Sequence, residues 1–162
     1  MSLRRRLLLV APVVLASVSF AACAVPGPAE PPPAEAPVRQ YLEPRTAADT
    51  TLPPFSGAVL TGNTLYLSGH IGVDDQQRVP DTAEAEAAAV LDQFQATLKL
   101  AGMTMDDLVF VQVFCSDVAH YAAWNTVYRK YFQKEFPARA FIGSGKLLFD
   151  ARFELQGIAV RR

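Results

Sequence analysis

Histidine and cysteine are scarce in this sequence of 162 residues, which contains two of each. The cysteines, Cys23 and Cys115, are too few for a disulfide framework, and we do not expect them to pair because their sequence contexts differ. The histidines, His70 and His120, show neither H-x-x-x-H nor Cys-His spacing, so no metal site is predicted. A net charge of −1 provides no electrostatic footprint for nucleic acid, and we expect no such partner.

Long apolar runs are also missing. The apolar run near the N-terminus, Leu7 to Phe20, is interrupted by Pro12 and is shorter than the ~20 residues that a membrane-spanning helix needs. It follows the charged run Arg4-Arg5-Arg6 and leads into small residues, so residues 1–24 are typical of a bacterial export signal. The sequence therefore predicts a periplasmic or cell-envelope location.

Two cleavage sites compete at the end of this segment. Ala22-Cys23-Ala24 fits ordinary secretion, which would release a soluble periplasmic protein. Phe20-Ala21-Ala22-Cys23 resembles a lipobox, although leucine is usual where Phe20 stands. We favour lipidation of Cys23, because a cysteine directly after two alanines is otherwise an uncommon choice there. Membrane attachment through the lipidated Cys23 would follow.

A proline-rich stretch separates this segment from the rest. Residues 25–37 contain six prolines in thirteen residues, which predicts an extended, semi-rigid linker. The folded domain is expected over residues 38–162. The composition, 51% hydrophobic, is sufficient for a real core.

Apolar spacing and turn residues predict the elements of this domain. They are a strand at 38–42, a hairpin at 58–69 that turns at Gly62-Asn63, a helix capped by Asp81 with Glu84 that ends before Gly102, a strand at 108–115 covered on both faces, a helix capped by Asp117 that continues to Phe132, and strands at 138–143 and 152–160. This order predicts an α+β fold, with two helices packed on one face of a single mixed sheet. Because no element remains to cover the apolar residues of the other face, we expect oligomerisation.

Two charged residues stand within the last two apolar strands. Arg139 begins one and Glu154 lies inside the other. Charged groups are rarely buried unless they are paired or used. A structural ion pair or an exposed strand face would explain them without any function.

Several ordered motifs decide between these interpretations. They are Pro54-Phe55, Gly62-Asn63, Ser68-Gly69, Ala101-Gly102, Val113-Phe114, Asn125 with Tyr128 and Phe132, Phe136-Pro137-Ala138-Arg139, and Glu154 before Ile158-Ala159-Val160. Together they resemble the RidA (YjgF) family of reactive-intermediate deaminases. The resemblance covers residues 41–162 and implies a chorismate-mutase-like fold, a homotrimer, and active sites in the clefts between subunits.

The resemblance also implies roles for individual residues. Arg139 would bind the carboxylate of a small-molecule substrate, and Glu154 would orient the attacking water, without a cofactor. Substrate-binding positions would be Phe55, Ser68, Gly69, Asn125 and Phe141.

The chain departs from the family pattern near these positions. Phe55 stands where many members have tyrosine, Phe141 where many have cysteine, and His70 where glutamine is common. The function implied is hydrolysis of 2-imino or 2-enamino acids to 2-keto acids and ammonia. The alternative is a non-catalytic, small-ligand-binding envelope protein on the same trimer.

Overall fold

The computed structural model describes residues 37–162 except residues 44, 45, 47, 49 and 75. The predicted export signal, Cys23 and all of the linker but Pro37 lie outside these residues, and the domain boundary at residue 38 stays a prediction. None of the helices in the described part has the length and apolar character needed to cross a membrane.

Six strands of the described residues form one mixed sheet in the order β1-β2-β3-β6-β4-β5. Their bounds are β1 Arg39–Leu42, β2 Ala58–Thr61, β3 Thr64–Ile71, β4 Leu108–Cys115, β5 Ala138–Gly143 and β6 Phe153–Val160. Neighbouring strands are antiparallel except β4 and β5, which are parallel. This exception follows from the chain path, because a parallel pair needs a crossover, and α2 lies within it.

The hairpin prediction is confirmed. Thr61 pairs with Thr64, so Gly62 and Asn63 form a two-residue turn between β2 and β3. Gly62 has φ of 57°, a left-handed conformation that costs glycine little. Such turns match the twist of the strands they connect.

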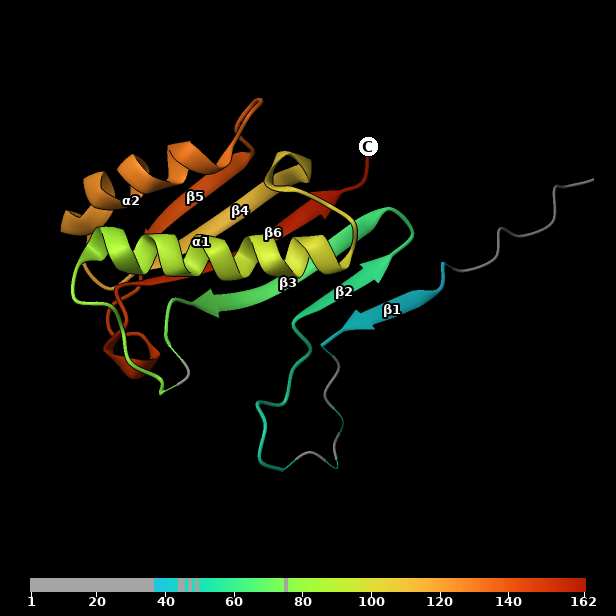
Figure 1. Cartoon of the computed structure of the whole chain (residues 1–162), viewed down its shortest axis with the longest axis horizontal. Helices are drawn as coiled ribbons and strands as arrows, with labels where there is room; N and C mark the ends of the chain where they lie inside the picture. The colour runs from blue at the N-terminus through green and yellow to red at the C-terminus, as the bar shows by residue number, and fades with distance from the viewer. Residues whose placement is uncertain (1–36, 44–45, 47, 49, 75) are drawn as a thin grey trace, which may run out of the picture. The chain divides into compact units, whose positions relative to one another are not determined.

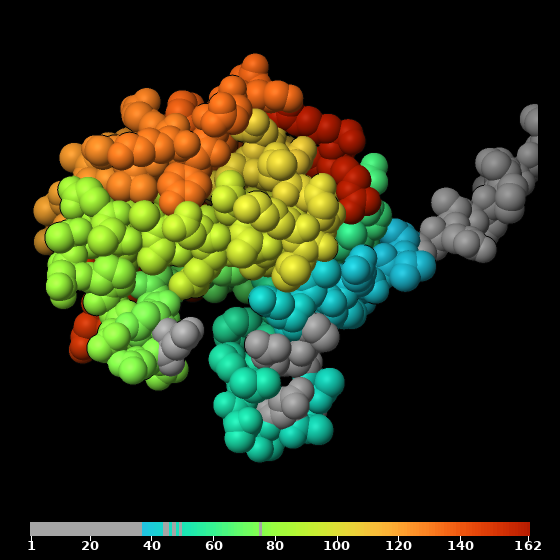
Figure 2. Space-filling view, viewed as in Figure 1, coloured from blue at the N-terminus to red at the C-terminus, as the bar shows by residue number. Residues whose placement is uncertain are grey.

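Two helices, α1 (Ala83–Leu100) and α2 (Tyr121–Tyr128), lie on the same side of the sheet (Figure 1). Figure 2 shows this side in space-filling form, with α1 and α2 in contact with each other. Short 3₁₀ helices occupy Met105–Asp107, Val118–His120, Arg129–Tyr131 and Leu148–Asp150. The predicted α+β architecture, two helices on one face of a single mixed sheet, is therefore confirmed.

The two faces of the sheet differ sharply. On the covered face, which packs against the helices, the side chains of Leu65, Val111, Val113 and Leu155 are fully buried. The opposite side, which we call the open face, carries Tyr66, Phe110, Phe114, Ile142, Glu154, Gln156 and Ile158, all of them at least partly exposed. Strand β4 was expected to be covered on both faces, and within one protomer only one face is covered. The apolar residues of β4 that lie on the open face belong to a surface that no other described part of the chain covers.

Both predicted helix caps need correction. Thr82, not Asp81, caps α1, because its hydroxyl accepts a hydrogen bond from the Ala85 amide at 3.2 Å. Asp117 caps the 3₁₀ turn that precedes α2, through the Ala119 amide. Helix α2 also ends at Tyr128, earlier than the aromatic spacing predicted.

Candidate functional site

Arg139 lies on β5, at the edge of the sheet. It pairs with buried Val111 of β4, so its side chain belongs to the covered face. Its guanidinium carbon lies 4.8 Å from the centre of the Tyr128 ring, 5.8 Å from that of Tyr121 and 6.0 Å from that of Phe141. No ion pair joins it to any carboxylate of the described residues. Arg139 is therefore held by aromatic faces with its charge unneutralised.

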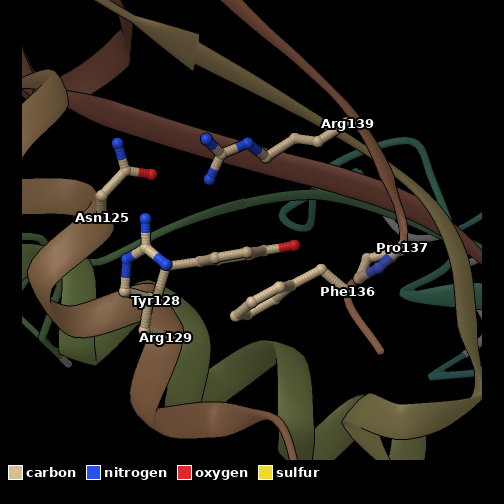
Figure 3. Close-up of a pocket in the computed structure, with 6 residues that line it drawn as sticks. All are labelled: Asn125, Tyr128, Arg129, Phe136, Pro137 and Arg139. Carbon is tan, nitrogen blue, oxygen red and sulfur yellow. The ribbon is translucent and has the colours of Figure 1, made fainter. Parts of the chain in front are cut away.

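A small pocket opens beside Arg139, with a volume of about 180 Å³. We call it the arginine pocket, and its lining residues are Asn125, Tyr128, Arg129, Phe136, Pro137 and Arg139. Figure 3 shows the amide of Asn125 and the guanidinium group of Arg139 above the Tyr128 ring, the Arg129 guanidinium beside the end of that ring, and the Phe136 ring below it. The arrangement offers several nitrogen donors and no acidic group, so it suits a small anion.

The hydroxyl of Tyr128 is an unusual feature of this pocket. The residue is only 3% exposed, and its hydroxyl has no hydrogen-bond partner within the described part of the chain. Burial raises the pKa of Tyr128 to about 12, although the nearby Arg139 charge opposes this. The group therefore remains a neutral donor at neutral pH.

Glu154 lies on the other side of the sheet. It pairs with Ile71 of β3 and Phe114 of β4, and its neighbours Phe153 and Leu155 point into the core. Strand alternation therefore directs Glu154 to the open face. Within one protomer, Arg139 and Glu154 do not meet.

Gly69 is brought together with Glu154. One extra residue stands in β3 between Leu67 and His70, and this bulge sets Gly69 beside β6. A Cβ atom on Gly69 would overlap the Glu154 carboxylate, so only glycine leaves this position free for the carboxylate. The predicted site residues thus fall into two groups, one around Arg139 and one around Glu154.

The remaining predicted residues follow this division. Asn125 and Phe141 lie near Arg139, in the pocket and against its guanidinium respectively. Ser68 neighbours Gly69, and its hydroxyl donates to the Ser56 carbonyl at 2.6 Å, which anchors the loop before β2. Phe55 lies in that loop and is 54% exposed.

A buried ion pair holds the start of β6. Glu86 of α1 is fully buried and accepts hydrogen bonds from the amides of Arg152 and Phe153 at 2.6 and 2.9 Å. Its second oxygen contacts the Arg152 guanidinium at 2.8 Å. Because these residues directly precede Glu154, the pair ties the position of that carboxylate to the core.

Both histidines contact neighbouring side chains or backbone groups of the domain. His70 contacts the Ser68 carbonyl at 2.8 Å and the Thr97 hydroxyl at 3.0 Å, and burial lowers its pKa. His120 packs edge-on against Phe153. Among the described residues, no group of three or more His, Cys, Asp or Glu side chains could hold a metal ion.

Cys115 is buried on the covered face, and its thiol donates to the Asp117 carbonyl at 3.0 Å. Burial also raises its thiol pKa, so the thiolate that a nucleophile requires is disfavoured. Cys115 therefore serves as a buried packing residue of β4.

Sequence reasoning gave no site role to four residues of the arginine pocket, namely Tyr128, Arg129, Phe136 and Pro137, of which Phe136 and Pro137 were named only in the motif that contains Arg139. Tyr128 was interpreted only as part of an apolar helix face and family motif, and Arg129 was not considered. Both follow Asn125 at helical spacings of three and four residues, which put side chains on one face. That spacing was the available signal.

Comparison with known proteins agrees with this fold. Residues 46–161 match the sequence model of the family described as endoribonuclease L-PSP. A goat (Capra hircus) protein named 2-iminobutanoate/2-iminopropanoate deaminase is 37% identical over 116 residues, which are 70% of this chain and 85% of the goat protein. The Drosophila melanogaster RutC family protein UK114 is 34% identical, over 76% of this chain and 90% of its own length.

Solved structures extend the agreement to three dimensions. The YjgF gene product of E. coli has a TM-score of 0.65 and 33% identity, and E. coli TdcF with bound serine has a TM-score of 0.65 and 28% identity. Each alignment covers 69% of this chain and 91% of the solved one. Matches of this extent, over nearly the whole described unit, show that the chain belongs to the RidA (YjgF) family.

Proposed function

We propose that this protein is an imine deaminase, which hydrolyses 2-imino acids, and the enamines that tautomerise to them, to 2-keto acids and ammonia. The observation that carries the proposal is the unpaired Arg139 guanidinium in a small pocket free of acidic groups. The names of the relatives, 2-iminobutanoate/2-iminopropanoate deaminases, support it.

Arg139 has the chemistry that a 2-imino acid requires. A planar guanidinium offers two parallel N–H donors, which match the two oxygens of a carboxylate. The surrounding rings of Tyr121, Tyr128 and Phe141 restrict its rotation. Substrate binding therefore costs little ordering of the arginine, and the imine carbon is held at a defined distance from the anchored carboxylate.

Glu154 would serve the water. The carboxylate accepts one proton as the water oxygen attacks the imine carbon, and passes it to the imine nitrogen, which gives a carbinolamine. The remaining hydroxyl proton is then transferred through the same carboxylate to the nitrogen as the carbon–nitrogen bond breaks, so that the carbonyl forms and ammonia leaves. The products are the 2-keto acid and ammonia, so the reaction consumes one water and needs no oxidant or reductant.

The complete site requires two subunits. Arg139 belongs to the covered face at the sheet edge, whereas Glu154 belongs to the open face, so one chain cannot direct both at the same substrate atom. We propose a homotrimer in which the Arg139 group of one subunit meets the Glu154 group of its neighbour.

The open face supports association. Tyr66 is 50% exposed and Ile142 37% exposed, and a hollow of about 200 Å³ lies between Tyr66, Phe110 and Ile158. Apolar side chains gathered on an uncovered sheet face are typical of a surface that binds another chain.

The direct test is steady-state hydrolysis of 2-iminobutanoate generated in situ by an amino-acid oxidase. Wild-type protein should outpace spontaneous hydrolysis. Arg139→Ala should lower kcat/KM by on the order of thirtyfold, and lysine should restore little because it lacks the planar fork. If wild-type protein leaves the spontaneous rate of every imino acid unchanged, the deaminase proposal fails and a non-catalytic ligand-binding role replaces it.

For location, we propose export with Cys23 lipidated and residues 25–37 as the tether. The support is the sequence pattern of residues 1–24 alone. Cys23→Ser should abolish acyl labelling and move the domain to the soluble periplasmic fraction. A wild-type protein without acyl mass would instead establish ordinary signal cleavage.

A further inference from the structure

The arginine pocket contains two cations. Arg129 follows α2, and Arg139 approaches from β5. Neither forms an ion pair with a described carboxylate, whereas Arg78, Arg152 and Arg162 all do. One planar guanidinium is enough to bind one carboxylate. The proposed deaminase reaction on a substrate with a single carboxylate therefore gives Arg129 no role in binding.

Aromatic rings orient both cations without neutralising them. The guanidinium carbon of Arg129 lies 5.9 Å from the centre of the Phe136 ring, and that of Arg139 lies 4.8 Å from the centre of the Tyr128 ring. In Figure 3 the two guanidinium groups extend from different elements toward the same space, beside the Asn125 amide. A ligand there meets positive charge from two directions.

The Tyr128 ring forms part of the wall of the same pocket. Its hydroxyl is buried and has no hydrogen-bond partner among the described residues. In Figure 3 this hydroxyl lies at the end of the ring away from Arg129 and Asn125, so the ring, and not the hydroxyl, borders the space beside the two guanidinium groups.

The part of the pocket that one protomer forms is small. Its volume of about 180 Å³ lies below the about 300–1,000 Å³ usual for pockets that hold drug-sized ligands. A pocket of this size suits a small ligand such as a dicarboxylate with four or five carbon atoms.

We propose that the arginine pocket selects 2-imino acids with a second carboxylate, the imines of acidic amino acids. Arg139 binds the carboxylate next to the imine carbon, and Arg129 binds the distal carboxylate. Arg129 is thus a specificity-determining residue and takes no part in the chemical step. The preference in hydrolysis rests on the proposed deaminase function, whereas the preference in ligand binding can be measured without turnover.

The experiment compares two ligand pairs on the full chain and its variants. Binding of succinate and butanoate is measured by calorimetry, and hydrolysis is measured for 2-iminosuccinate and 2-iminobutanoate generated in situ. The test variant is Arg129→Gln. The matched control is Lys130→Gln, which removes the same charge from the next residue, an exposed side chain outside the arginine pocket.

Wild-type protein should bind succinate about tenfold more tightly than butanoate, the effect expected of one added charge-assisted contact at a partly exposed site. Arg129→Gln should remove this preference and should lower kcat/KM for 2-iminosuccinate about tenfold more than kcat/KM for 2-iminobutanoate. Lys130→Gln should change neither the preference for succinate in binding nor the relative hydrolysis of the two imines.

The possible failures are distinguishable. If both imines are hydrolysed with equal efficiency and Arg129→Gln affects them equally, the inference is overturned while the deaminase function stands. If neither imine is hydrolysed but succinate still binds in an Arg129-dependent way, the deaminase function fails and the dicarboxylate preference survives. Equal binding of succinate and butanoate by wild-type protein overturns the preference in either case.

Discussion

The two faces of the sheet show how one sequence can satisfy two different environments. The covered face is completed by the chain's own helices, with Phe94, Val111 and Leu155 fully buried. The open face alternates with it residue by residue along β6, and along β4 from Phe110 onward, yet its side chains stay partly exposed. The same strands therefore stabilise the subunit on one side and leave apolar side chains uncovered on the other.

The predicted catalytic residues divide between these faces. Arg139 lies with α2 at the edge of the covered face, and Glu154 stands on the open face beside Gly69. Each protomer thus holds two half-sites that face different ways. If both residues act on one substrate, catalysis should depend on assembly.

Subunit mixing tests this division most strongly. Glu154→Gln should lower kcat by about 10²–10⁴-fold, because it removes the general base while keeping the side-chain shape. Arg139→Ala should also be poorly active. When equal amounts of the two variants are mixed and reassembled, roughly a quarter of the sites in a trimer would combine both native residues, and activity should return to that fraction of wild type.

Mass spectrometry of intact mixed trimers provides the control for this exchange. If mixed trimers form and activity does not return, the proposal that Arg139 and Glu154 of one active site come from different subunits is wrong.

On the covered face, Phe94→Ala should lower the free energy of unfolding by about 3–5 kcal/mol. The Phe94 ring is fully buried and packs edge-on against His70, at 5.2 Å between ring centres. Urea denaturation at a fixed protein concentration measures the loss. A change below about 1 kcal/mol would show that this face is less tightly packed than the structure indicates.

On the open face, Tyr66→Ser should weaken subunit association, with little effect on the fold of each subunit. Burying an aromatic side chain contributes about 1.5–3 kcal/mol, so the dissociation constant should rise by roughly ten- to a hundredfold. Sedimentation at several concentrations measures it. Leu100→Ser is the matched control, because Leu100 is an exposed apolar residue at the end of α1. If the two substitutions weaken association equally, the open face is not the specific site of subunit association.

The smallest effect concerns the helix that covers the sheet. Thr82→Ala should destabilise the protein by about 1 kcal/mol through loss of the cap on the Ala85 amide. Asp81→Ala should change stability little, because only the backbone carbonyl of Asp81 bonds Arg152. Thermal or chemical unfolding measures the loss of stability in both variants. A larger loss for Asp81→Ala than for Thr82→Ala would show that Asp81 caps α1, as the sequence predicted.

The order of elements, the Gly62-Asn63 turn and the single-sheet α+β fold were predictable from sequence. Local chemistry decides these features: Gly62 accepts a left-handed conformation, and apolar spacing distinguishes α1 from the strands. Helix ends were less predictable, because Asp81 and Thr82 are both capable caps and the choice depends on where the chain enters the helix.

For the candidate site, the sequence by itself determined that Arg139 and Glu154 stand in the last two strands, and the resemblance to the family implied their roles. Only the tertiary structure decided that they lie on opposite faces, that Tyr128 and Arg129 join Arg139, and that Gly69 lies under Glu154. The reason is that alternation along a strand shows which residues share a face, but not which face the helices cover. That choice follows from packing between segments distant in sequence, such as Glu86 of α1 with Arg152 before β6.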